Sequence, residues 1–128
     1  GHHVDAWSKA FAEAGMLIPL PQLFRFTDIG PGWSKPGIAY PEAASVVKYL
    51  VERYGFEKFI LAYRSLKRSS DDQDIATNRA KFTEIFGIGL EEVEKSWLES
   101  LKAATLEAVP KPRLDELRLK YGPAAGTR

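Results

Sequence analysis

The chain has 128 residues, which is the size of one ordinary domain, and its 45% hydrophobic and 27% charged residues exclude a disordered chain. Its 18 Lys and Arg nearly balance its 17 Asp and Glu, and a net charge of +1 argues against a domain-wide electrostatic contact with nucleic acid or anionic lipid. No apolar run approaches the length of about 20 residues that a membrane span needs.

The first half of the chain shows one helical segment followed by irregular, proline-rich sequence. Apolar residues at three- and four-residue spacing predict a helix over residues 3–14, and Gly15 suits its C-terminal end. The apolar run that follows is cut by Pro19 and Pro21, which predicts a buried connector because a strand interior rejects proline. Residues 25–40 hold three glycines and two prolines, so we expect a long loop there, with Trp33 at its middle.

Four further helices are expected in the remainder of the main body. Pro41 occupies the position of a first helical residue, and the periodic pattern from it ends at Gly55. A helix over 57–66 should turn Phe59, Ile60, Tyr63 and Leu66 inward, and Asp74 should be the N-cap of the next, which Gly87 closes. A helix over 90–106 should bury Leu90, Val93, Trp97 and Leu101. No segment alternates with period two, so we predict an all-α fold: a compact array of about five helices, with a long Gly/Pro-containing loop and a short C-terminal helix.

The C-terminal part of the chain differs in charge from the rest. From Lys102 onward there are six Lys and Arg against three Asp and Glu, a balance of +3 that leaves −2 for residues 1–101. Pro110 and Pro112 should separate it from the preceding helix. We therefore expect a helical domain or subdomain over 1–109 and a basic tail over 110–128, with a short docked helix.

Three stretches of the sequence, taken together, carry a family resemblance. They are residues 5–7 with 13–20, residues 39–55 (AYPEAASVVKYLVERYG) and residues 86–97 (FGIGLEEVEKSW). Their order and spacing resemble the C-terminal helical half of the bacterial peptidase MA-like (gluzincin) zinc metallopeptidases, over about residues 1–103. The middle stretch is the most specific of the three.

The resemblance implies a zinc site that this sequence does not contain. In that family a His-Glu-x-x-His helix and a later glutamate hold the zinc, and both precede the part represented here. The two histidines of this chain, His2 and His3, are adjacent and cannot replace an i, i+4 pair on a helix. We therefore expect a non-catalytic helical subdomain that packs on the missing catalytic half and shapes its cleft, with zinc only in that half. The parent's catalytic domain would be its partner, and a peptide or protein its substrate.

A different class of function remains open beside this one. The chain could be a stand-alone helical protein-interaction module that uses the loop around Trp33 or the basic tail. The absence of cysteine removes disulfides, thiolate zinc sites and cysteine nucleophiles, but leaves the compartment open. The sequence starts at Gly1 without methionine, so we expect a piece of a longer protein. A bacterial extracytoplasmic location would require an N-terminal segment outside this sequence.

The candidate site residues each have a functional and a structural interpretation. With a free amine at Gly1, His3 and the first amide nitrogens form a square plane suited to Cu(II) or Ni(II), while the alternative is a cleavage scar. Tyr40, Glu42 and Ser45 would lie beside the family's cleft, where a tyrosine can stabilise an oxyanion; alternatively they are a packed tyrosine and an ordinary helix start. Trp33, in its loop, is the aromatic residue that we expect to be partly exposed and available for contacts.

Overall fold

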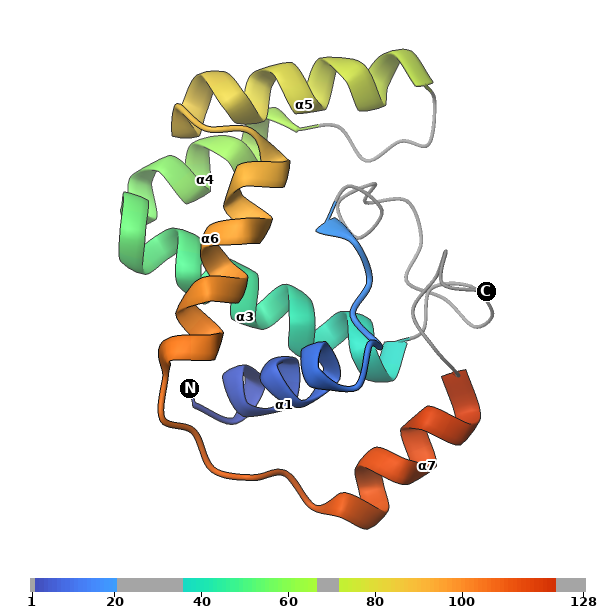
Figure 1. The fold of residues 1–128 in the computed structure, drawn as a ribbon. Helices are drawn as coiled ribbons and strands as arrows, with labels where there is room; N and C mark the ends of the chain where they lie inside the picture. The colour runs from blue at the N-terminus through green and yellow to red at the C-terminus, as the bar shows by residue number, and fades with distance from the viewer. Residues whose placement is uncertain (1, 21–35, 67–71, 122–128) are drawn as a thin grey trace.

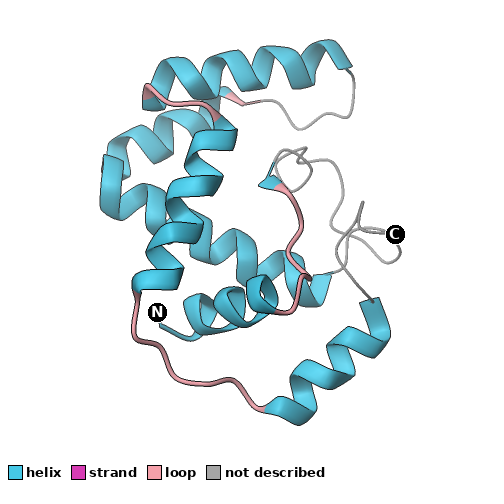
Figure 2. Cartoon of the chain, in the orientation of Figure 1, coloured by secondary structure: helices cyan, strands magenta, loops and turns pink. Residues whose placement is uncertain are grey.

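The structure is a computed structural model, and it describes residues 2–20, 36–66 and 72–121. Every regular element among these residues is a helix, so the predicted all-α class is confirmed (Figure 2). The helices are α1 (His2–Glu13), α3 (Pro36–Tyr54), α4 (Phe56–Ser65), α5 (Asp72–Phe86), α6 (Leu90–Ala103) and α7 (Lys111–Tyr121). No helix in the described part of the chain is long and apolar enough to cross a lipid bilayer.

α3, α4 and α5 each contact the next helix along the chain, and α1 contacts both α3 and α6 (Figure 1). Gly15, Gly55 and Gly87 follow α1, α3 and α5 with φ angles of 69°, 97° and 74°. Glycine adopts this left-handed conformation without a steric penalty, so the three helix ends predicted at these glycines are confirmed.

Pro41 does not begin a helix, and this prediction was wrong. α3 begins earlier, at Pro36, and Pro41 lies inside it. Proline is equally suited to the first position at residue 36, and the helix then continues past Pro41, which lacks the N–H that would bond to the carbonyl of Gly37. The N–H of Gly37 itself donates to the hydroxyl oxygen of Tyr121, at 3.1 Å. Residues 36–40, which the sequence placed in the long loop, are therefore helical.

Three smaller predictions also differ from the structure. α5 begins at Asp72, so Asp74 lies in its first turn rather than at the N-cap. Tyr63 is 75% exposed, and the buried residue of α4 is Ala62, one position earlier on the helix. α6 ends at Ala103, although the sequence pattern continues to Leu106. The chain has no glycine or proline at that point, so a sequence pattern alone contains no signal for the end of α6.

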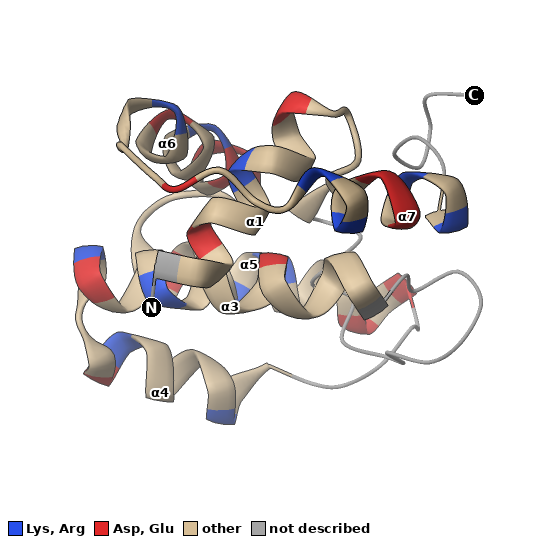
Figure 3. Ribbon diagram, turned by 90° about the horizontal axis from the view of Figure 1, so that it is seen from below, with Lys and Arg blue, Asp and Glu red and all other residues tan. Residues whose placement is uncertain are grey.

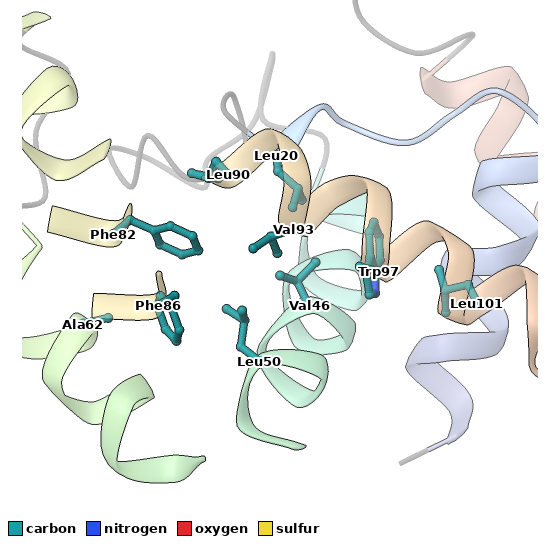
Figure 4. Packing of buried hydrophobic residues seen from close by; sticks show 10 residues of the cluster. All are labelled: Leu20, Val46, Leu50, Ala62, Phe82, Phe86, Leu90, Val93, Trp97 and Leu101. Carbon is teal, nitrogen blue, oxygen red and sulfur yellow. The ribbon is translucent and has the colours of Figure 1, made fainter. Parts of the chain in front are cut away.

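The described residues form two groups of buried apolar side chains. The larger group, the main core, lies between α3, α4, α5 and α6 and centres on Trp97, Val93 and Phe86 (Figure 4). Trp97 is 1% exposed, as its helical spacing from Val93 and Leu101 predicted. The second group, the end cluster, joins α1, the connector and the start of α3 to α7; its members are Phe11, Met16, Ile18, Ile38, Ala39 and Leu117.

Candidate functional site

Two glutamates hold residues 16–20, the connector that follows α1. The backbone N–H of Ile18 donates to Oε1 of Glu42 at 2.9 Å, and the N–H of Leu20 donates to Oε2 of Glu94 at 2.7 Å. Pro19, between them, has no N–H to satisfy. Carboxylates from α3 and α6 thus replace the backbone partners that a strand would have provided, which is how this apolar segment is buried without a sheet.

Glu42 is completely buried, and this changes its acidity. Burial raises the pKa of Glu42 from 4.5 to about 8; the hydrogen bond from Ile18 opposes this shift, and the negative charge of Glu94 adds to it. Oε2 of Glu42 has no hydrogen-bond partner among the described residues. A carboxyl group in this environment is protonated at neutral pH, because a buried charge without a counter-ion is expensive.

One turn further along α3, Ser45 joins three helices through a chain of hydrogen bonds. Its Oγ donates to Oδ1 of Asp5 on α1 at 2.6 Å and accepts the Nε1–H of Trp97 on α6 at 3.0 Å. Lys48 donates to the other carboxylate oxygen of Asp5, also at 2.6 Å, and this bond raises the pKa of Lys48 above its ordinary value. Ser45 is 1% exposed, so its hydroxyl is fully used inside the protein.

The geometry separates the candidate residues Tyr40, Glu42 and Ser45. Glu42 and Ser45 turn into the helical array, while Tyr40, on the same helix, is 59% exposed. The interpretation of Tyr40 as a packed residue is therefore wrong: the buried face of α3 at this level is formed by Ile38, Ala39 and Glu42. Neither Glu42 nor Ser45 has the solvent access that a general base or a nucleophile needs, whereas the Tyr40 side chain does.

The residues present do not fit a zinc site. Among the described residues, no three His, Cys, Asp or Glu side chains lie close enough together to hold a metal ion. His3 is exposed on α1, and its Nε2 accepts the Nε1–H of Trp7 at 3.3 Å. Gly1, Trp33 and the side chain of His2 lie outside the described part of the chain, so the copper or nickel hypothesis and the contact role of Trp33 stay predictions.

The sequence did not single out four of the residues that complete these contacts. They are Asp5, Lys48, Glu94 and Trp97: the sequence predicted Trp97 only as a core residue, and each of the four donates or accepts a hydrogen bond with the connector or in the chain of bonds around Ser45. The spacing of Ser45 and Lys48, three residues apart on one helix face, is a signal that both reach the same neighbour. The partner, Asp5, lies 40 residues away from Ser45, and local patterns cannot identify such a pair.

Comparison with known protein families, with characterised proteins and with solved structures gives no match for this chain.

Proposed function

We propose that the chain is the non-catalytic, C-terminal helical subdomain of a peptidase MA-like zinc metallopeptidase homologue. It would hold no zinc ligand and no general base; it would pack on the catalytic half and shape one wall of its cleft, to which Tyr40 would contribute a hydrogen-bond donor. The basis is the resemblance over residues 1–103, centred on residues 39–55, of which 39–54 lie in α3. The zinc and its ligands would belong entirely to the catalytic half, because no group of side chains in the described part of this chain fits a zinc site.

The observation that best supports this proposal is the exposed position of Tyr40 on a rigidly held helix. Glu42 and Ser45, two and five residues further along α3, are fixed by hydrogen bonds to the connector and to α1. Tyr40 is 59% exposed on the opposite side. A side chain that must meet a transition state needs this combination of access and a fixed backbone, because catalytic hydrogen bonds depend on preorganised donors.

The experiment uses the longer gene product. We expect the gene to encode a His-Glu-x-x-His helix upstream of Gly1, and the longer protein to have zinc-dependent peptidase activity. Tyr40→Phe in that protein should lower kcat by about 100-fold, the effect of losing one oxyanion donor. Tyr63→Phe, on the 75% exposed tyrosine of α4, is the matched control and should leave kcat unchanged. A longer protein without the zinc motif, or turnover by the isolated chain, would contradict the proposal.

The structure gives less support to an independent interaction module. The loop around Trp33 lies outside the described residues, and the helix of the basic tail uses its apolar side within the chain, where Leu117 is 4% exposed. Along α7, Asp115 and Glu116 have basic residues on either side, so the helix carries both signs of charge (Figure 3). We therefore favour the subdomain over the module.

A further inference from the structure

The end of α6 is the point at which the structure differs most informatively from the sequence pattern. The helical pattern runs on to Leu106, and the first residue that opposes a helix is Pro110. Nevertheless α6 ends at Ala103, and Ala104 is extended, with φ −76° and ψ 141°. Residues 104–110, which we call the linker, therefore contain a segment that favours a helix but is extended in this conformation.

The contacts that hold the linker are few. Lys9 of α1 donates to the carbonyl oxygen of Ala104 at 2.9 Å, and Leu106 is half-buried at the edge of the main core. Among the described residues, the backbone groups of 105–109 have no hydrogen-bond partner. Two adjoining grooves of about 510 and 650 Å³ lie between α1 and the linker, with Ala6 and Leu106 in the walls of both. The linker thus crosses α1 without packing tightly on it.

α7, in contrast, is seated in a specific site. Leu117 is 4% exposed in the end cluster, and the Tyr121 hydroxyl accepts the N–H of Gly37, one of the unpaired donors in the first turn of α3. A Cβ atom on Gly37 would lie 3.0 Å from Tyr121 and 3.1 Å from Leu117. The site therefore fits this helix closely, and its contacts do not depend on which copy of the chain supplies α7.

From these observations we infer that the chain forms a homodimer by exchanging α7 between two copies. In the exchange the linker residues before Pro110 join α6 as one continuous helix, which carries α7 away from its own end cluster and onto that of the partner. Every contact of α7 is made again in the dimer, and the linker gains the helical hydrogen bonds that it lacks in the monomer. What the exchange loses is the Lys9–Ala104 bond, the contact of Leu106 and the entropy of association. This inference does not depend on the proposed function.

The test measures the oligomeric state of the full chain against concentration, by size-exclusion chromatography with light scattering. Thr105→Ala favours the helical form of the linker, by about threefold in the equilibrium constant for helix formation in each chain. Because two linkers become helical in the dimer, its association constant should rise about tenfold. Ala104→Gly should lower the dimer fraction, because glycine lowers the helix propensity of the linker. The helical circular dichroism per residue should be higher in the dimer than in the monomer. A chain that stays monomeric at all concentrations, in the Thr105→Ala variant too, would overturn the inference.

A further measurement distinguishes an exchanged dimer from one that forms through another face. The chain has no cysteine, so single cysteines can be introduced at Ala14 and at Arg118, which line the same groove. When the two variants are mixed, unfolded and refolded together, a bismaleimide should link residue 14 of one copy to residue 118 of the other within the dimer. Gly37→Ala strains the site of α7 in the monomer and in the dimer alike, so it should change the dimer fraction no more than Gly89→Ala, whose added Cβ has no atom within 4 Å. A dimer without this cross-link would refute the exchange.

Discussion

Glu42 and Ile18 are joined by a buried hydrogen bond between residues 24 positions apart, in which the N–H of Ile18 donates to Oε1 of Glu42. This bond attaches the connector to α3, and among the described residues the carboxyl group that accepts it has no counter-ion beside it: the other charged group that affects its pKa is the carboxylate of Glu94. Glu42 therefore both fixes the connector and makes the stability of the fold depend on pH.

The stability of the fold should fall as pH rises from about 4.5 to about 8, because of Glu42. Its pKa is about 8 in the folded chain and 4.5 as an ordinary glutamate, so in this window the folded state binds more protons than the unfolded state. The free energy of unfolding then decreases with rising pH, and it levels off above about pH 8, where Glu42 is ionised in both states. Urea unfolding across this window measures the slope.

Glu42→Gln should remove most of that slope and raise stability at pH 8. The amide keeps an acceptor for the N–H of Ile18 and carries no charge, so it imitates the protonated acid. Glu107→Gln, on an exposed residue of the linker, is the control and should change neither quantity. An unchanged slope in Glu42→Gln would mean that Glu42 is not the group that titrates.

Ser45→Ala should destabilise the fold by about 1–3 kcal/mol, because it leaves two buried partners without their hydrogen bonds. Asp5 Oδ1 loses a donor, and the Nε1–H of Trp97 loses its acceptor. Thr83→Ala removes a hydroxyl that bonds only to the carbonyl of Arg79 on the exposed side of α5, and it should cost much less. Thermal unfolding of the two variants compares them directly; equal losses would show that the Ser45 network adds no stability.

Trp97→Ala should cost about 3–5 kcal/mol, the usual range for removing a large buried aromatic side chain. Trp97 is 1% exposed and contributes to the main core that joins α3 to α6. Trp7→Ala is the comparison, since Trp7 is only half-buried and its Nε1–H bonds to the exposed His3, so a smaller loss is expected. A melting temperature only a degree or two lower for Trp97→Ala would contradict the role assigned to this residue.

The sequence predicted the helices well, and it predicted the polar contacts between them poorly. Helical spacing placed Trp97, Val93 and Leu101 on one buried face, because that face depends only on local periodicity. The start of α3 was missed because Pro36 and Pro41 are both acceptable first residues, and only the contact of Gly37 with α7 distinguishes them. Glu42 reads as an ordinary first-turn carboxylate in the sequence; its burial depends on the connector folding over it, which no local pattern records.

Gly37→Ala should destabilise the docking of α7 and leave the main core folded. An added Cβ would approach Tyr121 and Leu117 to about 3 Å, closer than these side chains normally pack, so α7 must shift or leave. The buried residue of α7, Leu117, belongs to the end cluster and not to the main core. The helical signal of α3 to α6 should therefore persist in the variant, whose melting temperature should be lower. Gly89→Ala is the matched control, because its Cβ would meet no atom within 4 Å and its φ of −77° suits any residue.

Cutting the chain after Ala108 should leave a cooperatively folding main core. The truncation removes Leu114, Leu117 and Tyr121, and therefore uncovers Phe11 and Ile18 in the end cluster. The ten buried residues of the main core all precede the cut, so unfolding monitored by circular dichroism should stay a single transition at a lower temperature. Glu42 would gain access to water through the uncovered connector, and the fall of stability with rising pH should become shallower. A truncated chain that fails to fold would show instead that α7 is an indispensable part of the domain, and that the boundary expected near Pro110 is wrong.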